Sequence, residues 1–356
     1  MTTFGHREFA GHERVIFVSD NATGLRAIIA LHDRTLGPAV GGCRVYPYAS
    51  EDDALADVLR LSRGMTYKNA LAGLPFGGGK SVIIADPSAK TPALIHAFGR
   101  AVDELQGQYW TGEDVNFGAH DVEILAERTP YLLGRTKGAT NTGDPSPFTA
   151  RGVFAGMKGA LEHVFGTRDL AGRRVAIQGA GNVGFNLARL VTEAGGDVVV
   201  ADVRAESTER AARELGAAVV ASDAIYDQAC DVFAPCAMGA TINGQTIPRL
   251  KAQIVCGAAN NQLATADAGK LLRDRGIAYA PDYVVNAGGI INAFGDFTGH
   301  YDVEDVTRKV DAIAETVREI LRSAEENNRP SHEVADAMAE TILAAAREQQ
   351  SVHRKP

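Results

Sequence analysis

The fold of this chain is decided by the stretch RRVAIQGAGNVGFNLARLVTEAGGDVVVADVR, residues 173–204. An apolar run at residues 175–177 leads into the glycine-rich turn GAGNVG, residues 179–184. A helical pattern follows, in which Leu187, Leu190 and Val191 line one face. The next apolar run, residues 198–201, ends at Asp202. This succession of strand, glycine turn, helix and strand predicts a dinucleotide-binding βαβ unit.

The same stretch indicates which dinucleotide binds. Gly179, Gly181 and Gly184 allow close approach of a pyrophosphate to the N-terminus of the helix, which carries partial positive charge. Asp202 follows Gly179 by 23 residues, a spacing at which a carboxylate accepts a hydrogen bond from a ribose 2′-hydroxyl. Arg204 could face a 2′-phosphate or be a solvated loop charge, but Asp202 would repel that phosphate. The pattern therefore favours NAD over NADP.

Length and composition restrict the remaining possibilities. A chain of 356 residues is longer than a single hydrophobic core usually supports, so we expect two domains. A net charge of -8 provides no basic stripe for nucleic acid. The absence of a long apolar run and the charged N-terminus argue against a membrane span and a signal peptide, so we expect a cytoplasmic protein. The four cysteines form no CxxC pair and the nine histidines no HExxH motif, so no metal is expected.

Periodicity predicts two kinds of domain. In the first half, strand-like runs at residues 15–18, 25–31 and 82–85 alternate with helices, one beginning near Ser50 and one at residues 93–105. In the second half, short apolar strands at residues 231–235, 253–256 and 277–280 alternate with helical patterns, which is typical of a parallel, doubly wound sheet. A helix is expected from residue 150 to 165, and a final one from Asn328 or Ser331.

We therefore expect an α/β fold of two domains separated by a cleft. Residues 1–140 form a mixed α/β domain for substrate binding and catalysis, and residues 141–330 form a Rossmann domain that binds NAD. The turn-rich segment TNTGDPSPFT, residues 140–149, is interpreted as the hinge between them. The C-terminal helix, about residues 330–356, is expected to pack, either back on the first domain or against another subunit.

Two lysines lie 12 residues apart beside a run of glycines, in GMTYKNA (64–70) and LPFGGGKS (74–81). The run is not a P-loop, because five residues separate Gly73 from Gly79 where four are needed, and because Lys80 leads into a strand. In a partly desolvated cleft, burial and a second cation both favour the neutral amine, so Lys80 is a candidate general base. Lys68 is then the charged partner for an anionic group. Two ordinary surface lysines are the alternative.

Two carboxylates come directly after the strand-like residues 108–110, in TGEDVN (111–116). One of them is positioned to exchange protons with a substrate, and the other is more simply a helix cap or an ion-pair partner. The residues alone do not distinguish Glu113 from Asp114.

Seven segments in this order give the chain a resemblance to a known family over nearly its whole length. They are VGGCR (40–44), MTYKNALAGLPFGGGKSVI (65–83), GEDV (112–115), GDPSPFTARGV (143–153), GAGNVG (179–184), GAANNQL (257–263) and NAGGIIN (286–292). The chain resembles the Glu/Leu/Phe/Val amino acid dehydrogenase family, and in particular its leucine and phenylalanine members. The resemblance implies NAD-dependent oxidative deamination of an L-amino acid to a 2-oxo acid and ammonia, reversible by reductive amination, in a homo-oligomer.

The resemblance also assigns roles to individual residues. Lys80 activates the water that attacks an iminium carbon, Lys68 pairs with the substrate carboxylate, and Asp114 passes protons to and from the substrate nitrogen. Asn261 also holds the carboxylate, unless Asn260 and Asn261 simply form a turn. The remaining implied contacts are Gly41 and Gly42 for the substrate backbone, and, for the cofactor, Ser146, Thr149, Gly179, Gly181, Asn182, Val183, Gly184, Asp202, Arg204, Cys236, Ala237, Met238 and Asn286.

The substrate side chain is expected to be apolar because Val40 precedes Gly41. The leucine enzymes that this chain resembles carry alanine at the position of Gly112 and valine at that of Ala293, and both exchanges would enlarge the pocket. We therefore expect L-phenylalanine, converted to phenylpyruvate in phenylalanine catabolism, with a leucine or valine dehydrogenase as the alternative. Gly112 could also serve backbone conformation alone. A 2-hydroxy acid dehydrogenase would need a His/Asp relay, and a non-catalytic NAD sensor would not need both lysines.

Overall fold

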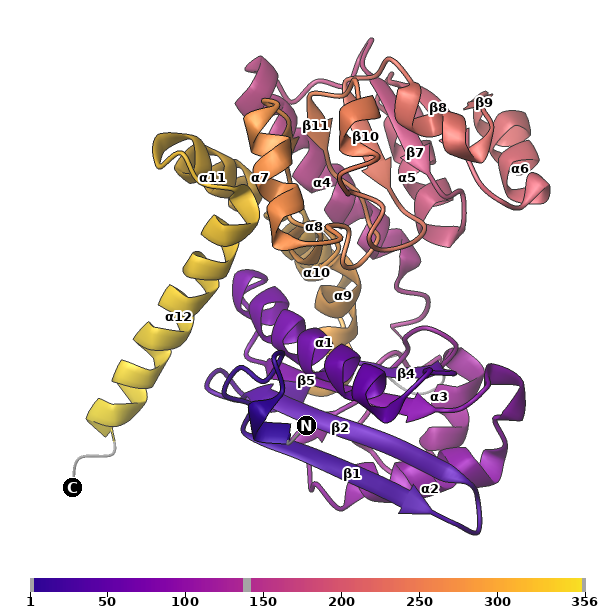
Figure 1. Ribbon diagram of the computed structural model, residues 1–356, viewed down its shortest axis with the longest axis vertical. Helices are drawn as coiled ribbons and strands as arrows, with labels where there is room; N and C mark the ends of the chain where they lie inside the picture. The colour runs from indigo at the N-terminus through magenta and orange to yellow at the C-terminus, as the bar shows by residue number, and fades with distance from the viewer. Residues whose placement is uncertain (1–2, 137–141, 354–356) are drawn as a thin grey trace. The chain divides into compact units, whose positions relative to one another are not determined.

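The computed structural model describes residues 3–136 and 142–353 and divides the chain into two compact units (Figure 1). The first comprises Met1–Asp144, Ala293–Asp302 and Ala339–Pro356, and the second Pro145–Asn292 and Val303–Met338. The first unit therefore includes two late segments that a single division at residue 140 would not assign to it. The two-domain α/β fold expected from the sequence is confirmed.

The first unit is built on a mixed six-stranded sheet. Its strand order is β1-β2-β5-β3-β6, and β4 also pairs with β5. The glycine run is part of strand β5, which begins at Gly77 and therefore five residues before the predicted start at residue 82. This strand is buried along almost its whole length. The strands are β1 (Arg14–Asp20), β2 (Leu25–Asp33), β3 (Ala39–Val40), β4 (Cys43–Tyr46), β5 (Gly77–Ile84) and β6 (Tyr109–Trp110).

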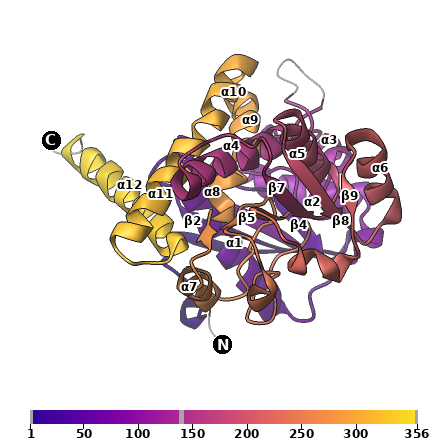
Figure 2. The same cartoon turned by 90° about the horizontal axis from the view of Figure 1, so that it is seen from above.

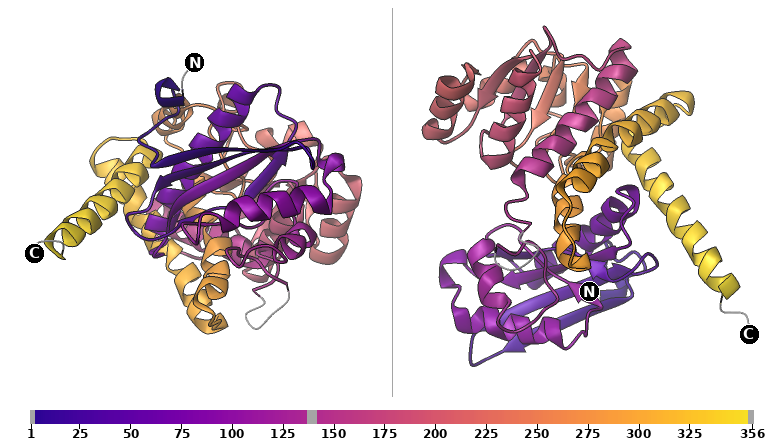
Figure 3. Two further views of the ribbon diagram at one scale, coloured as in Figure 1. Left: turned by 90° about the horizontal axis from the view of Figure 1, so that it is seen from below. Right: turned by 180° about the vertical axis from the view of Figure 1, so that it is seen from behind.

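Helices cover both faces of this sheet. Helix α1 (Glu51–Leu71) packs Val58 and Leu59 against Ile28 of β2, and α2 (Pro92–Asp103) packs Phe98 in the core that contains Ile29. These two β2 residues are adjacent, so their side chains lie on opposite faces. The predicted cap of α1 is confirmed, since the side chain of Ser50 accepts a hydrogen bond from the amide of Asp53. A short helix, α3 (Ala119–Leu125), follows; Figure 3 gives two further views.

The second unit contains a parallel six-stranded sheet in the order β12-β11-β10-β7-β8-β9. With β7 as the first strand, this is the 3-2-1-4-5-6 order reversed, which is the Rossmann arrangement and confirms the doubly wound prediction. The strands are β7 (Arg174–Gln178), β8 (Asp197–Ala201), β9 (Ala218–Val219), β10 (Val232–Pro235), β11 (Ile254–Val255) and β12 (Ala278–Tyr279).

Helices α4, α5, α6 and α7 contact this sheet, with α4 and α5 side by side (Figure 2), and α8, α10 and α11 pack against α4. Helix α4 begins at Ser146 instead of residue 150, because Pro147 is favourable in a first helical turn. Of the expected hinge, residues 146–149 are therefore helical, and residues 140 and 141 lie outside the described residues. The helices are α4 (Ser146–Phe165), α5 (Asn182–Glu193), α6 (Ala205–Leu215), α7 (Ala266–Asp274), α8 (Asp282–Val285), α10 (Val303–Asp311) and α11 (Ile313–Glu326).

Two helices contribute residues to both units. They are α9 (Gly288–Thr298), which the division cuts before Ala293, and α12 (Ser331–His353), which it cuts before Ala339. The start of α12 at Ser331 is one of the two predicted positions. Across residues 3–136 and 142–353, none of the helices is both long and apolar enough to cross a bilayer.

Candidate functional site

A buried ion pair joins two of the predicted catalytic residues. Lys80, in the middle of β5, is 5% exposed, and its Nζ lies 2.9 Å from Oδ1 of Asp114. Asp114 follows β6 in a tight turn that is closed by two backbone hydrogen bonds between Asp114 and Phe117, of 3.1 and 2.9 Å. Asn116 adopts the left-handed conformation that this turn requires, with φ 59°. The turn thereby holds the carboxylate against the central strand.

A third residue, Arg44 of β4, completes this cluster. Its Nε donates to Oδ2 of Asp114 at 2.8 Å, and a second guanidinium nitrogen contacts Asp57 at 2.9 Å. Tyr48 donates to the same oxygen of Asp57 at 2.6 Å. Burial by itself would raise the pKa of Asp114, but the charges of Lys80 and Arg44 outweigh it and hold the pKa of that carboxyl well below its usual range. Asp114 is therefore an ionised carboxylate with both oxygens engaged.

The contact with Asp114 was not part of the expectation for Lys80. That expectation rests on burial and on a second cation, whereas the structure also brings a carboxylate to within 2.9 Å of Nζ. The action of Lys80 as a base stays a prediction.

The structure separates the two carboxylates that the sequence left equivalent. Asp114 contacts Lys80 and Arg44, whereas Glu113 is half-buried and forms no ion pair within the described residues. Burial, followed by the charges of Asp144 and Asp121, raises the pKa of Glu113. Of the two carboxylates, Asp114 is thus the one that lies beside Lys80.

The glycines around this cluster are explained by packing within the protein. A Cβ on Gly41 would lie 1.9 Å from the carbonyl oxygen of Gly79, and a Cβ on Gly42 would lie 2.1 Å from that of Glu113. The space that these glycines leave is therefore occupied by neighbouring backbone. The expectation that the two missing side chains make room for substrate is not supported at their Cβ positions. Val40, which precedes them, is 1% exposed.

Lys68 is half-buried near the C-terminal end of α1. It comes three residues after Met65, so the two side chains are neighbours on the helix surface. Cγ of Met65 lies 3.0 Å from the Cβ position of Gly41. The structure thus places Lys68 in the same unit as Lys80.

The two positions expected to widen the substrate pocket have different surroundings. A Cβ on Gly112 would lie 2.9 Å from the carbonyl oxygen of Leu133, so that space is filled and the backbone explanation for this glycine is favoured. Ala293 is 8% exposed on α9. Downstream in α9, Phe297 packs edge-on against Phe76 and Trp110, with ring centroids 4.9 Å apart in both contacts. This aromatic cluster, which sequence reasoning did not find, ties the end of α9 to the first unit.

The glycine turn of the second unit has the geometry expected of a dinucleotide site. Gly179 adopts φ 97°, and a Cβ on Gly184 would lie 1.9 Å from the carbonyl oxygen of Gly179. Asp202 accepts hydrogen bonds from the amides of Ala180 (2.8 Å) and Arg204 (2.9 Å). Among the residues that the structure describes, the guanidinium of Arg204 alone comes within 4 Å of the Cβ position of Gly181, at 3.4 Å, so the N-terminus of α5 can receive a phosphate. These residues fit a dinucleotide, and Asp202 in addition clamps the turn.

The other residues assigned to the cofactor belong to the same unit. Asn182 and Val183 open α5, Cys236 directly follows β10, and Ala237 contacts the Cβ position of Gly179 at 2.8 Å. Met238 is 73% exposed. These positions lie at the carboxyl ends of β7 and β10, which is where α/β sheets bind their ligands.

Asn286 and the start of α4 add polar groups to the second unit. Nδ2 of Asn286 donates to Oδ1 of Asn260 at 2.8 Å, while its own Oδ1 is buried without a partner among the described residues. A buried acceptor of this kind fits a ligand donor such as a carboxamide. Ser146 and Thr149 lie in the first turn of α4, where Thr149 donates to the carbonyl of Pro145 at 3.0 Å. Asn261 is exposed in a left-handed turn with φ 52°.

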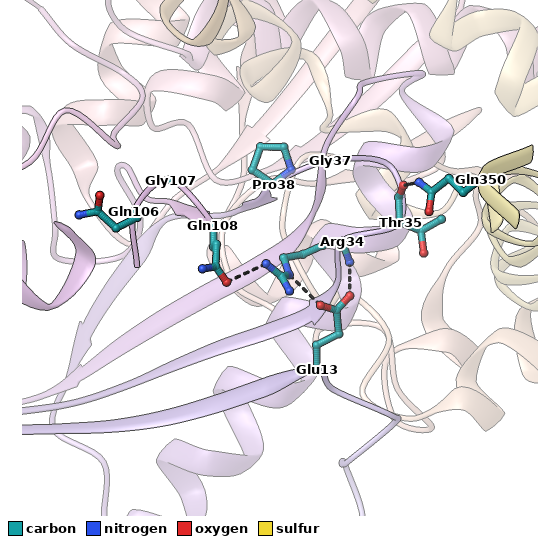
Figure 4. A pocket seen from close by; sticks show the side chains of 9 residues that line it. All are labelled: Glu13, Arg34, Thr35, Gly37, Pro38, Gln106, Gly107, Gln108 and Gln350. Carbon is teal, nitrogen blue, oxygen red and sulfur yellow. Dashed lines mark hydrogen bonds and ion pairs between the residues drawn. The ribbon is translucent and has the colours of Figure 1, made fainter. Parts of the chain in front are cut away.

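A surface hollow of about 470 Å³ in the first unit is lined by none of Lys80, Asp114 and Arg44 (Figure 4). In it Arg34 donates to Glu13 at 2.7 Å and to Gln108 at 2.8 Å, so the guanidinium is already engaged by neighbours. The hollow is lined by Glu13, Arg34, Thr35, Gly37, Pro38, Gln106, Gly107, Gln108 and Gln350.

Both units match domain models of one known family. Residues 12–137 match the Glu/Leu/Phe/Val dehydrogenase dimerisation domain, and residues 144–205 and 200–351 match the Glutamate/Leucine/Phenylalanine/Valine dehydrogenase domain. Dehydrogenases of this family are NAD(P)-dependent, with which the predicted NAD is consistent.

Individual relatives are similar to this chain over nearly its whole length. Leucine dehydrogenase of Geobacillus stearothermophilus is 46% identical over 352 residues, covering 99% of this chain and 96% of the relative. Valine dehydrogenase of Streptomyces virginiae is 44% identical and covers 97% of each chain. The crystal structure of L-tryptophan dehydrogenase from Nostoc punctiforme superposes with a TM-score of 0.82 at 43% identity, covering 95% of this chain and 97% of that one. The chain therefore belongs to the Glu/Leu/Phe/Val dehydrogenase family and is an amino acid dehydrogenase.

Proposed function

We propose that this protein catalyses the NAD-dependent, reversible oxidative deamination of L-amino acids with apolar side chains to 2-oxo acids and ammonia. The observation that carries the proposal is the buried contact of 2.9 Å between Lys80 and Asp114, with Arg44 on the second carboxylate oxygen. A lysine and a carboxylate in contact can exchange a proton with a bound amine or water. NAD, when bound by the second unit, accepts the hydride that leaves the α-carbon of the substrate.

The residues of the first unit perform the remaining steps in this proposal. Lys68 pairs with the substrate carboxylate, and Asp114 receives the proton of the substrate amine. After hydride loss Lys80, acting as the neutral amine, removes a proton from the water that adds to the iminium carbon. Asp114 then gives its proton to the nitrogen of the carbinolamine. The C–N bond breaks to release ammonia, and the hydroxyl proton passes to Asp114 as the 2-oxo acid forms. Because the pKa of Asp114 is low, this carboxylate holds a proton only briefly and passes it on. Asn261 is a second proposed ligand of the substrate carboxylate.

The proposal names phenylalanine as the first candidate substrate and leucine or valine as the second. Ala293 stands where the leucine enzymes that this chain resembles have valine, and the smaller side chain favours phenylalanine as the substrate. The relatives compared above carry leucine, valine and tryptophan in their names, and Gly112 is filled by Leu133 and adds no volume at its Cβ position. These two observations favour leucine or valine as the second candidate. One methylene of mismatch costs only about 1–3 kcal/mol, so activity on both classes is expected.

We also propose that the chain assembles with copies of itself. Support comes from the family description of residues 12–137 as a dimerisation domain. The reacting partners proposed for the assembly are small molecules only, namely L-amino acid, 2-oxo acid, ammonia and NAD.

An absorbance assay of NADH formation tests the activity. The purified chain is given NAD and a panel of L-amino acids that includes phenylalanine, tryptophan, leucine, valine and glutamate. The reverse reaction is measured with phenylpyruvate and with the 2-oxo acid of leucine, each with and without ammonium. NADH consumption that requires ammonium supports the proposal. Consumption without ammonium would indicate a 2-hydroxy acid dehydrogenase, and no turnover with any member of the panel would refute the proposal.

A further inference from the structure

Tyr109 of β6 is fully buried and packs against the strand that carries Lys80. Its ring fills the space beside Gly79, where an added Cβ would lie 2.8 Å from Cδ2 of the ring. Its hydroxyl lies 2.9 Å from Oγ of Ser81. Side chains alternate along a strand, so that of Lys80, between these two residues, points to the opposite face of the sheet. Tyr109 therefore supports β5 from behind the Lys80 side chain.

The hydroxyl of Tyr109 donates to the carbonyl oxygen of Gly41, at 2.6 Å. Because a carbonyl only accepts and the phenol has one hydrogen, Ser81 donates its own hydrogen to the tyrosine oxygen. Oγ1 of Thr111 lies 3.2 Å from the same oxygen. Burial raises the pKa of Tyr109 well above its usual range, so the phenol stays protonated and is a permanent donor.

The bond to Gly41 is made where the pairing of β3 with β6 ends. Val40 and Trp110 are the last paired residues of the two strands. The amide of Gly41 still donates to the carbonyl of Trp110, at 3.1 Å. In a regular parallel ladder the carbonyl of Gly41 would accept from the backbone of the neighbouring strand, and here the Tyr109 side chain donates to it. The hydroxyl thus extends the connection to β6 beyond the ladder.

The segment that starts at Gly41 leads to the groups around Asp114. The Cβ position of Gly42 lies 3.2 Å from Cβ of Asp114, and two residues later Nε of Arg44 donates to this carboxylate at 2.8 Å. The other carboxylate oxygen contacts Lys80 of β5 at 2.9 Å. One buried hydroxyl is therefore bonded both to the segment that holds Asp114 and to the strand that carries Lys80.

We propose that Tyr109 is a positioning residue, whose hydroxyl sets the spacing between Lys80 on β5 and the segment that holds Asp114. The inference rests on the proposed deamination, in which these two groups move the protons. Tyr109 is assigned no contact with the substrate or with NAD, and it acts through Gly41 and Ser81. Without the hydroxyl, the carbonyl of Gly41 loses a buried donor and the segment shifts. Displacement of reacting groups by about 1 Å can lower a rate by about a hundredfold.

Tyr109→Phe removes the hydroxyl and keeps the packed ring. In the NADH assay we expect kcat for the best amino acid of the panel to fall by about tenfold to a hundredfold. KM for NAD should stay within about twofold, because the dinucleotide turn belongs to the other unit. The acid limb of the kcat/KM profile should move to higher pH, since a longer contact with Lys80 stabilises ionised Asp114 less.

Ser62→Ala is the matched control for Tyr109→Phe. It also removes a fully buried hydroxyl of the first unit, which donates to the carbonyl of Leu59 at 3.0 Å. We expect kcat and the pH profile of Ser62→Ala to be those of the unsubstituted protein. A kcat that falls equally in both variants would show that the loss of any buried hydroxyl has this effect, and would overturn the role of Tyr109.

A double-mutant cycle tests whether Tyr109 and Ser81 act together. Ser81→Ala removes one bond of the tyrosine oxygen and leaves the bond to Gly41, so its kcat should fall by less than that of Tyr109→Phe. The double variant should be no slower than Tyr109→Phe alone, because Ser81 acts through the missing hydroxyl. Losses that multiply in the double variant would contradict this network. If Tyr109→Phe does not fold, Ser81→Ala alone must show the lower kcat and the shifted acid limb.

Urea unfolding and a crystal structure of Tyr109→Phe separate the remaining outcomes. Lower stability with unchanged kcat and pH profile would overturn the inference and leave the proposed function intact. No turnover in the unsubstituted protein would refute the function, and the crystal structure then tests the inference by itself. We expect the carbonyl of Gly41 to move and the contact of 2.9 Å between Lys80 and Asp114 to lengthen. Unchanged positions of these groups would overturn the inference.

Discussion

Arg44 donates from Nε to Oδ2 of Asp114 over 2.8 Å and thereby occupies the carboxylate oxygen that Lys80 does not contact. Arg44 is itself held by Asp57, so a chain of alternating charges runs from β5 through the turn at Asp114 to α1. Of the groups in our proposal Arg44 contacts Asp114, and it is assigned no contact with the substrate or with NAD. It is a positioning residue that orients Asp114 and keeps it ionised.

Replacing Arg44 by methionine should change the pH dependence of the reaction. Loss of one positive neighbour raises the pKa of Asp114, so this carboxyl protonates at a higher pH and the acid limb of the kcat/KM profile moves upward. We expect turnover to fall about tenfold or more at low pH and by less at high pH. Arg26→Met, which removes an exposed partner of Glu51, is the control and should leave the profile unchanged. An unmoved acid limb in Arg44→Met would contradict the positioning function.

The same variant should be less stable in acid. A carboxyl with a lowered pKa in the folded state stabilises the protein above the pKa of the unfolded chain, and this contribution is lost as the pH falls through the folded value. Because the folded pKa of Asp114 is raised toward the unfolded value in Arg44→Met, this contribution is smaller, and its loss is complete at a higher pH than in the unsubstituted protein. Breaking a buried charge pair also costs about 3–5 kcal/mol at neutral pH. Urea unfolding at a series of pH values measures both effects.

Lys80→Ala should nearly abolish turnover, by about a hundredfold to ten-thousandfold, because the proposed base is lost. Binding of NADH, measured by fluorescence titration, should remain near that of the unsubstituted protein, since the dinucleotide turn belongs to the other unit. Lys270→Ala, at an exposed lysine, serves as the control. A loss of NADH affinity as large as the loss of rate would be inconsistent with Lys80 acting on the substrate.

Asp202→Asn tests how the dinucleotide is selected. Asparagine retains an oxygen that can accept from the amide of Ala180, so the turn stays clamped while the negative charge is removed. We expect the ratio of kcat/KM for NADP to that for NAD to rise by roughly tenfold, equivalent to about 1.4 kcal/mol. Asp223→Asn, at an exposed aspartate of the same unit, should leave the ratio unchanged. If the ratio does not change in Asp202→Asn either, the ribose is recognised elsewhere.

Gly112→Ala separates packing from substrate selection. Because the new Cβ would lie 2.9 Å from the carbonyl oxygen of Leu133, we expect the free energy of unfolding to fall by about 1–3 kcal/mol. The relative rates on leucine and phenylalanine should change little. Gly244→Ala, where nothing lies within 4 Å of the added Cβ, is the matched control. A large shift toward leucine without loss of stability would restore the volume argument for Gly112.

Substrate selection is then tested at Ala293 alone. Ala293→Val adds volume at a position that is 8% exposed, and we expect the ratio of leucine to phenylalanine turnover to rise by about tenfold. Equal changes of both rates would remove Ala293 from the side-chain pocket.

The sequence by itself determined the Rossmann unit. Strand, turn, helix and acid follow one another within residues 173–204, and each is a local pattern, so periodicity and spacing are sufficient to locate them. The cap at Ser50 and the alternation of strands and helices were predictable for the same reason. The two lysines could be recognised as candidate catalytic residues because a run of glycines directly precedes Lys80 in the sequence.

The tertiary structure alone decided which groups meet at the candidate site. Lys80, Asp114 and Arg44 come from three separate elements, and only the pairing of β4 with β5 and the turn after β6 brings them into contact. Likewise, the glycines at positions 41, 42 and 112 look like open space in the sequence but are filled by backbone distant in the chain. Charge state and free volume are properties of all neighbours within a few ångströms, and sequence spacing does not specify those neighbours.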